Sequence, residues 1–146
     1  MSAIKSLQIV KKGMVIFMYE QDYIMRLIRE IVRTMVKLLF NKEADNEEII
    51  AINENDIGTK HNELLDLIDS GCIKEAEKLL LDTIDPHDIQ DYNVALMFYS
   101  YLNEKELNFL EEHNYSKKEI MEGLKYVSDI YGYGSMVNTL LGLVSD

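Results

Sequence analysis

The chain of 146 residues has little of several residue types on which special sites and folds depend. It contains one cysteine, one proline and no tryptophan. A single cysteine excludes an internal disulfide framework and a zinc site built on several cysteines. The sequence has no uncharged apolar run of about 18 residues, so we expect no transmembrane helix. The length and the 47% of apolar residues suffice for one domain with a sizeable core.

Basic residues are scarce in most of the chain. There are 15 lysines and arginines against 26 acidic residues, which gives a formal net charge of −11 and argues against nucleic acid as the main partner. Residues 1–42 hold eight of the bases and three of the acids, a net charge of +5, which leaves −16 for the remainder. Such a basic segment either seeks a polyanion or packs on an acidic body, its own or that of a second copy. We favour packing.

The first 17 residues carry lysines and lead into a short apolar run over residues 14–18. They lack the small-residue cleavage site of a secretory signal, so no signal peptide is predicted. Met14 and Met18 are alternative starts. We therefore expect residues 1–17 to be a translated leader or a weakly ordered extension.

Residues 18–42 form the most distinctive segment, a predicted basic amphipathic helix. Over residues 20–40 the apolar arc covers about half of the helix, which is wider than the stripe of an ordinary surface helix, and five charges on the other side exclude a membrane span. The apolar face comprises Ile24, Leu27, Ile28, Ile31, Val32, Met35, Leu38 and Leu39, and the basic face carries Arg26, Arg29, Arg33 and Lys37.

Three interpretations of this helix stay open. Its apolar face packs on the C-terminal body of the same chain, or pairs with the same face in a symmetric homodimer. The third is that the helix lies on an anionic membrane surface. The acidic body, which such a surface would repel, and the lack of tryptophan make the membrane the less favoured of the three.

After an acidic linker predicted over residues 43–58, residues 59–146 read as a helical domain of about five short antiparallel helices. The linker lacks the alternation and the glycine of a calcium loop. Start and stop signals divide the domain, and they predict Thr59, Asp85, Asn103 and Ser116 as N-caps and Gly71, Asn114 and Gly132 as helix ends. The predicted helices are 59–71, 73–84, 86–102, 104–113, 116–131 and 135–144.

Residues 64–86 resemble one tetratricopeptide hairpin. The loop glycine Gly71 is followed by Ile73 and Ala76, and a small residue at the latter position lets two helices approach closely. Thr83 departs from the usual alanine, and no clean second copy follows at an offset of 34 residues. Helical spacing and the lack of strand signals predict an all-α fold, and with this hairpin the prediction becomes a long amphipathic helix followed by a tetratricopeptide-like array.

Three stretches, at residues 19–26, 101–105 and 109–116, are similar to a family of small bacterial proteins of unknown function. Members of that family begin with Met-aromatic-Glu-Gln-Asp-Tyr, carry a basic apolar first helix and end in a tetratricopeptide-like body. The resemblance spans about residues 18 to 136 and favours Met18 as the family-like start. It implies no activity, cofactor or catalytic residue.

Residues with catalytic or metal-binding chemistry are few and scattered. His61, His87 and His113 are isolated from one another in the sequence, and Cys72 has no evident base. His87 has three aspartates nearby, which we interpret as a solvated helix start rather than a metal site. The chain has no Gly-rich phosphate loop, nucleophile elbow or zincin motif. We therefore predict no catalytic residue, no metal and no cofactor.

Seven of the nine tyrosines follow residue 90. At helical spacing most of them belong to a core, and the alternative is a groove that receives a peptide or helix. Tyr92 and Tyr99 are the candidates for such a groove.

The sequence thus predicts an all-α, non-catalytic protein–protein interaction or self-association module of the bacterial cytoplasm. Attachment to a membrane surface is the alternative, and an enzyme has no supporting motif. The expected partner is a protein, with a homodimer as one form. Twelve residues are candidates for the contact surface: Ile24, Leu27, Ile28, Ile31, Met35, Leu38, Arg26, Arg29, Arg33, Lys37, Tyr92 and Tyr99.

Overall fold

The protein is described from a computed structural model that covers residues 2–40 and 58–145, with side chains over 20–40 and 61–142. Every element in these ranges is a helix, so the predicted all-α class, with one long N-terminal helix followed by shorter ones, is confirmed. In the described ranges six helices follow the long one, one for each of the six predicted ranges. The predicted acidic linker lies outside the described residues except for Gly58. The helices are α1 (Ser2–Phe40), α3 (Gly58–Asp69), α4 (Ile73–Thr83), α5 (Ile89–Asn103), α6 (Leu107–Glu112), α7 (Lys117–Ile130) and α8 (Gly134–Ser145).

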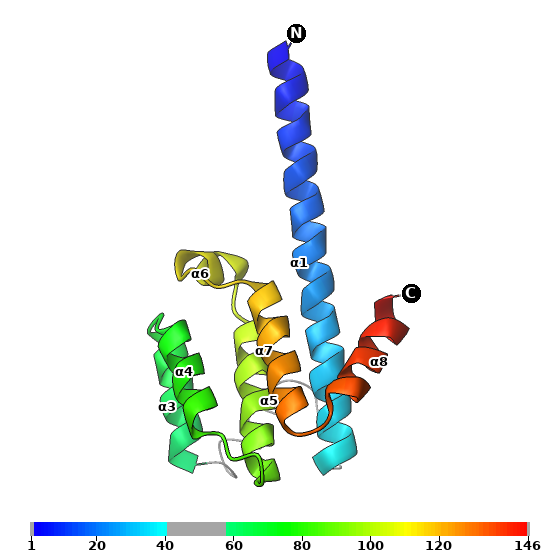
Figure 1. Ribbon diagram of the computed structural model, residues 1–146. Helices are drawn as coiled ribbons and strands as arrows, with labels where there is room; N and C mark the ends of the chain where they lie inside the picture. The colour runs from blue at the N-terminus through cyan, green and yellow to red at the C-terminus, as the bar shows by residue number, and fades with distance from the viewer. Residues whose placement is uncertain (1, 41–57, 146) are drawn as a thin grey trace.

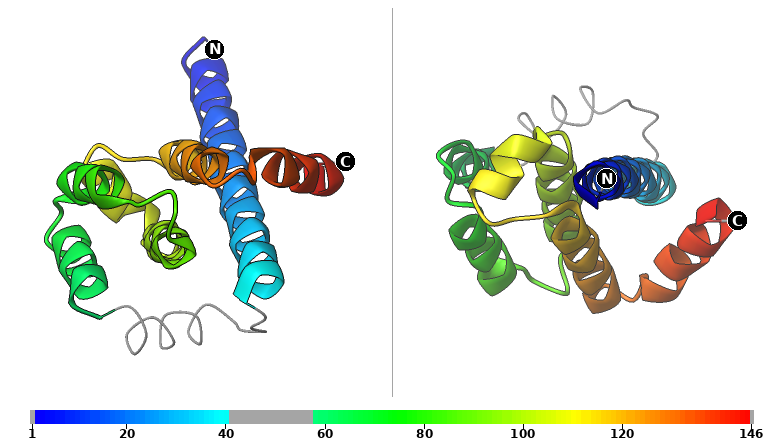
Figure 2. Two further views of the ribbon diagram at one scale, coloured as in Figure 1. Left: turned by 60° about the horizontal axis from the view of Figure 1, so that its bottom comes forward. Right: turned by 90° about the horizontal axis from the view of Figure 1, so that it is seen from above.

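Helix α5 is the centre of the domain, with α1, α3 and α7 packed around it (Figures 1 and 2). Every residue from 92 to 100 is buried, including Asn93 and Ser100. A helix that is apolar on nearly all sides has no solvent face to keep, so it forms a core rather than a surface. The run of apolar residues in this segment therefore places α5 in the middle of the bundle.

Helix α1 is longer than the sequence pattern predicted. The amphipathic pattern was clear from about residue 20, whereas the helix begins at Ser2 and runs without interruption to Phe40. Its N-terminal half rises well beyond the other helices, as Figure 1 shows. Residues 2–17, expected to be a leader or a weakly ordered extension, are helical backbone here, and whether they are a leader stays a prediction.

Three helices end in the same hydrogen-bonded turn, and the sequence predicted all three ends. Gly71, Asn114 and Gly132 have φ angles of +86°, +55° and +83°, the left-handed conformation that glycine and asparagine tolerate best. Each turn is a Schellman motif, with paired bonds from Gly71 N to Ile68 O and Cys72 N to Leu67 O, from Asn114 N to Glu111 O and Tyr115 N to Leu110 O, and from Gly132 N to Asp129 O and Tyr133 N to Ser128 O.

The start of α5 lies at a different residue from the one predicted. Asp88, not Asp85, caps α5, and its carboxylate accepts a hydrogen bond from Gln90 N at 3.0 Å. Asp85 instead accepts from His87 N at 2.9 Å, in a turn that precedes the helix. Either aspartate satisfies capping chemistry, so the sequence alone does not decide between them.

Asn103 was predicted to cap the next helix, and this is wrong. It is the last residue of α5, it is 1% exposed, and its side-chain amide donates to Met25 O of α1 at 3.0 Å. Helix α6 has Glu106 at its N-cap. The side-chain amide of an asparagine can either cap a helix or bond to a neighbouring helix. In Asn103 it bonds to the neighbouring helix α1.

The other predicted boundaries agree with the structure to within a few residues. Ser116 caps α7 as predicted, with its hydroxyl accepting from Glu119 N at 3.1 Å. Helix α3 begins at Gly58, so Thr59 lies within its first turn rather than before it. Helices α3 and α4 form a hairpin in which Ile73 and Ala76 are buried.

Candidate functional site

The two faces of α1 have different environments in the described part of the chain. Helices α5, α7 and α8 cover its apolar face. Ile28, Ile31 and Met35 are at most 1% exposed, Leu27 is 7% exposed, and Ile24 packs against the core. These residues, proposed as a contact surface, are thus core residues of a single copy, as in the first of the three interpretations of the helix. Leu38 is the exception, because it is 60% exposed.

The outward face of α1 carries the arginines. Arg26 and Arg33 are exposed, Arg29 is half-buried between them, and Lys37 is exposed one turn further along. These four residues are the basic face of α1, and Tyr23, which is 40% exposed, lies beside it. The sequence placed the four basic residues on one side of the helix, and the structure does the same.

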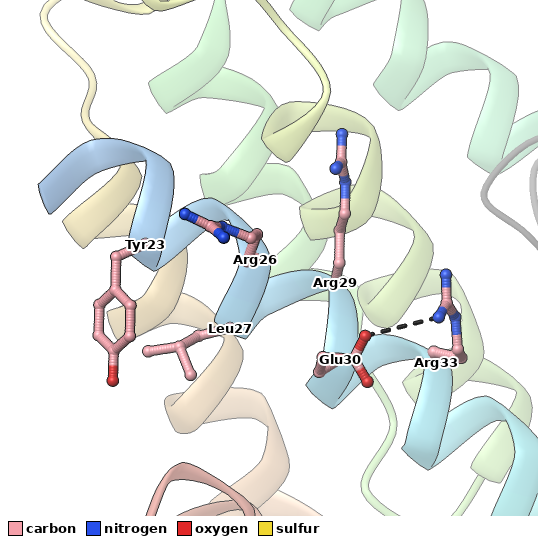
Figure 3. A pocket seen from close by; sticks show the side chains of 6 residues that line it. All are labelled: Tyr23, Arg26, Leu27, Arg29, Glu30 and Arg33. Atoms are coloured by element: carbon pink, nitrogen blue, oxygen red, sulfur yellow. Dashed lines mark hydrogen bonds and ion pairs between the residues drawn. The ribbon is translucent and has the colours of Figure 1, made fainter. Parts of the chain in front are cut away.

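A hollow of about 470 Å³ lies against this basic face. Its described lining consists of six residues of α1: Tyr23, Arg26, Leu27, Arg29, Glu30 and Arg33. Figure 3 shows the three arginine side chains leaving α1 in the same general direction, whereas Tyr23 and Leu27 extend to the other side. The hollow thus combines three guanidinium groups and the carboxylate of Glu30 with an apolar and aromatic edge, a composition suited to protein contacts.

Each arginine has a carboxylate partner in the same chain. Arg26 is 3.1 Å from Asp22, and Arg33 is 3.5 Å from Glu30, on adjacent turns of α1. Their side chains are more than half exposed, and ion pairs of this kind contribute little, typically about 0.2–1 kcal/mol. Such pairs hold the guanidinium groups loosely and leave them able to change partner.

Arg29 differs from the other two because it joins α1 to the end of α5. Its Nε and Nη2 donate to the two carboxylate oxygens of Glu104, both at 2.8 Å. The hydrogen bonds that Arg29 donates to Glu104 raise the pKa of Arg29 above its usual value. A bidentate pair of this geometry fixes orientation as well as charge. Arg29 therefore positions the helix, while Arg26 and Arg33 are available to a partner.

A second hollow, of about 300 Å³, lies where α1 passes the turn between α5 and α6. It is lined by Gln21, Asp22, Met25, Glu104, Lys105, Glu106, Leu107 and Lys117. We call these residues the shoulder. Three carboxylates belong to it, and Lys117 is 3% exposed.

Lys117 closes the C-terminal end of α5. Its Nζ donates to the carbonyl oxygen of Asn103 and, at 3.4 Å, to that of Lys105. Burial lowers the pKa of Lys117 to about 8, against a partial opposing effect from Glu104. The last carbonyls of a helix lack partners within it, so a buried amine at this point satisfies them. Sequence reasoning missed this residue, because no local pattern marks a lysine that becomes buried.

Tyr92 and Tyr99 do not line a groove. Both are fully buried, so the core interpretation of the tyrosines holds for them. The Tyr92 hydroxyl bonds to Ser128 at 2.8 Å, and its ring stacks on Tyr131 with centroids 4.8 Å apart. These tyrosines bind α5 to α7 and to the turn that follows it.

A carboxylate that the sequence did not indicate joins α4 to α5 and to the turn that precedes α7. One oxygen of Glu77, on α4, accepts hydrogen bonds from the hydroxyls of Tyr99 and Tyr115, both at 2.8 Å. Burial, strengthened by the nearby carboxylate, raises the pKa of both tyrosines well above the usual range. Glu77 has the sequence context of an ordinary surface residue of α4, and only the packing of α5 and α7 brings the tyrosines to it.

The residues with metal-binding chemistry lie apart. Within the described ranges, no three side chains of histidine, cysteine, aspartate or glutamate gather as a metal site would require. The aspartates near His87 form hydrogen bonds at the start of α5. Asp91 accepts a hydrogen bond from Asp85 N at 2.9 Å, and Asp88 caps the helix. His113 packs on Phe109 and against Gly71, far along the chain from His87.

None of the helices described has both the length and the hydropathy of a membrane-spanning segment.

Fold and site together define an all-helical protein with a basic, hollowed face on its longest helix. The chain belongs to a family described as "Family of unknown function (DUF6483)", whose model matches residues 18–132. The match begins at Met18, where the resemblance placed the family-like start. The comparisons with curated proteins and with solved structures gave no match.

Proposed function

We propose that this protein is a non-catalytic interaction module that binds an acidic segment of another protein on the basic face of α1. The contacts would come from Arg26 and Arg33, with Tyr23 at the edge of the hollow. The setting that we expect is the cytoplasm of a bacterium, and the helical body behind the site is expected to serve as a tetratricopeptide-like scaffold.

One observation carries the proposal: the arginines face outward on a helix whose other face is fixed in the core. A helix anchored in this way presents its outward side chains on a rigid support, which lowers the entropy lost on binding. Arginine is also among the residues enriched at protein interfaces, because its planar group pairs with carboxylates in two-point contacts.

The carboxylates already paired with Arg26 and Arg33 do not oppose this function. Both pairs are exposed, and each is worth about 0.2–1 kcal/mol. A partner carboxylate therefore has to displace only weak contacts, so the existing pairs oppose its binding by little.

Attachment to a membrane is the weaker candidate. Insertion into a bilayer needs the apolar face of α1, and residues 28, 31 and 35 of that face are at most 1% exposed. Releasing them from the core would cost on the order of 1.5–3 kcal/mol for each side chain.

The experiment is a comparison of captured proteins. The full chain is immobilised and exposed to cytoplasmic extract, beside a variant with Arg26→Glu and Arg33→Glu. A matched control carries Lys74→Glu and Lys78→Glu, the same charge change at exposed positions of α4. We expect a protein that the wild type and the control retain, that the arginine variant loses, and that dissociates at raised salt. Equal capture by all three proteins would refute the proposal.

A further inference from the structure

The exposed residues on the outward side of α1 form one line along the helix. They are Tyr23, Arg26, Glu30, Arg33 and Lys37, which follow one another at steps of three, four, three and four residues. Such steps keep side chains on one face of a helix. We call these five residues the outer stripe, and at 1.5 Å per residue it is about 21 Å long.

The charge along the outer stripe changes sign. Glu30 is the one acidic residue between Tyr23 and Phe40, and it lies four residues after Arg26 and three before Arg33. Its Oε1 is 3.5 Å from Nη1 of Arg33, in a pair whose two side chains are more than half exposed (Figure 3). A carboxylate therefore stands in the middle of the surface that we propose to bind an acidic segment.

The third arginine of the hollow does not offset this carboxylate. Arg29 donates two hydrogen bonds of 2.8 Å to Glu104, which commits its guanidinium group to the end of α5. Arg26 pairs with Asp22, which lies outside the described lining of the hollow. The positive charge offered to a partner is thus concentrated at Arg26 and Arg33, seven residues or about 10.5 Å apart along α1.

The spacing of the outer stripe indicates the conformation of the partner segment. A second helix beside α1 presents one face at the same steps of three and four, so it meets the stripe over its whole length. An extended segment places side chains of one face about 6.6 Å apart, against about 5.3 Å along the stripe. It therefore falls out of step by about one position over the length of the stripe.

We propose that the partner segment is a helix that lies along the outer stripe, with two acidic residues seven positions apart on Arg26 and Arg33 and a basic residue between them on Glu30. The proposal rests on the proposed function and narrows it, because Glu30 becomes the residue that selects the sequence of the partner. A uniformly acidic helix is disfavoured, since its central carboxylate faces Glu30 and like charges placed opposite one another reduce affinity.

Designed peptides test the charge pattern. Three alanine-rich helical peptides of about 20 residues contain Glu-Ala-Ala-Lys-Lys-Ala-Ala-Glu, or the same segment with Gln-Gln or Glu-Glu at its centre. The doubled centre keeps the pattern the same in both orientations of the peptide. Each peptide is titrated into the isotope-labelled full chain at low salt, and the amide chemical shifts of residues 23–37 give the location and the dissociation constant. We expect the Lys-Lys peptide to bind roughly fivefold more tightly than the Glu-Glu peptide, with the Gln-Gln peptide between them.

A charge reversal in the protein tests the role of Glu30. We expect Glu30→Lys to reverse the order of the three peptides. Glu75→Lys makes the same charge change at an exposed position of α4 and should keep the order of the wild type. The intrinsic helicity of each peptide is the same in all three titrations, so comparison between the proteins removes it. An unchanged order in Glu30→Lys would overturn the proposal.

A fourth peptide tests the helical conformation. It has the Lys-Lys centre with one neighbouring alanine replaced by proline, which the interior of a helix does not accommodate. We expect this peptide to lose the binding. Equal binding would show that an extended segment suffices, and equal affinities of the first three peptides, or shifts confined to residues outside 23–37, would contradict the charge pattern.

The two proposals fail in different ways. If capture from the extract depends on Arg26 and Arg33 while the peptides show no preference, the proposed function stands and the helical, charge-patterned partner is wrong. If capture does not depend on these arginines, the proposed function fails and the assignment of Glu30 fails with it.

Discussion

Gly123 lies where α7 passes the ring of Tyr99. A Cβ atom at this position would lie 2.5 Å from two ring carbons of Tyr99 and 2.5 Å from its hydroxyl oxygen, which is closer than real contacts allow. The ring has little room to move, because Tyr99 is fully buried and its hydroxyl is bonded to Glu77. The glycine is therefore required by a close approach and not by its backbone angles.

Gly123→Ala is expected to destabilise the protein. Overpacking of a rigid core site typically costs about 1–3 kcal/mol, which exceeds the roughly 1 kcal/mol that alanine gains over glycine in a helix. Urea unfolding followed by circular dichroism measures the difference. Gly142→Ala is the matched control, because a Cβ atom there meets nothing within 4 Å; it should be neutral or slightly stabilising. A neutral Gly123→Ala would show that α7 does not pack as described.

At this scale the sequence favoured a core for most of the tyrosines, because apolar bulk at regular helical intervals is a local signal. It named Tyr92 and Tyr99 as candidates for a groove, whereas both are buried, and it did not indicate their hydrogen bonds. Their partners Ser128 and Glu77 lie 36 and 22 residues away. No local pattern links residues so far apart.

At the scale of the element, the apolar face of α1 is buried in one part and exposed in another. Met35 is fully buried whereas Leu38, three residues further along, is 60% exposed. Both were predicted to lie on one apolar face, and the spacing supports that. The wide apolar arc continues past the edge of the covering helices, so only part of it is removed from water.

Met35→Ala and Leu38→Ala should therefore have very different effects on the free energy of unfolding. Truncating the buried methionine leaves a cavity and typically costs about 2–5 kcal/mol, whereas the exposed leucine should change the stability by less than about 0.5 kcal/mol. The free energy of unfolding from urea titration measures both. Equal effects would mean that α1 is not docked on the body as described.

Substitutions of the arginines of α1 should also differ in how much they lower the free energy of unfolding. Arg29→Met removes the bidentate pair that joins α1 to Glu104 and leaves that carboxylate near the buried Lys117. We expect it to cost roughly 1 kcal/mol, because the pair is about one third exposed and screened by solvent. Arg26→Met serves as the control, with a change of at most about 0.5 kcal/mol. Denaturant titration of both at low and high salt checks the order, which a larger loss for Arg26→Met would contradict.

At the scale of the whole molecule, stability should pass through a maximum between about pH 9 and pH 10. The unfolded chain holds the Lys117 proton up to about pH 10.5, and the folded chain releases it near pH 8. Between these values the unfolded state binds more protons at Lys117, so this group alone raises the free energy of unfolding by about 2 kcal/mol between pH 8 and pH 10, and the buried tyrosines offset an increasing part of that rise above about pH 9. Thermal and urea unfolding across this range measure the rise.

Above this maximum the buried tyrosines reverse the trend. In the folded chain burial raises the pKa of Tyr92 to about 12, and the pKa of Tyr99 is raised further, whereas the unfolded phenols ionise near pH 10. The folded state then binds more protons, and stability falls. Lys117→Met is the control, and it should remove the rise below pH 10 and keep the fall above it. A rise that persists in Lys117→Met would assign it to another group.

The sequence by itself determined the helical class, most helix boundaries and the two-sided character of α1. These rest on local rules: apolar spacing, capping by Ser116, and the left-handed turns at Gly71, Asn114 and Gly132. Such signals depend on residues only a few positions apart, so they can be recognised in the sequence without knowledge of the fold.

Only the tertiary structure decided what covers each face. The apolar side of α1 had three interpretations as a sequence, and the packing of α5, α7 and α8 selects the core of its own chain. Likewise Asn103 becomes a bond between helices, Lys117 becomes buried, and Glu77 gains two tyrosines. Burial and pairing depend on residues distant along the chain, and a sequence pattern shows which side of a helix is apolar but not which surface meets it.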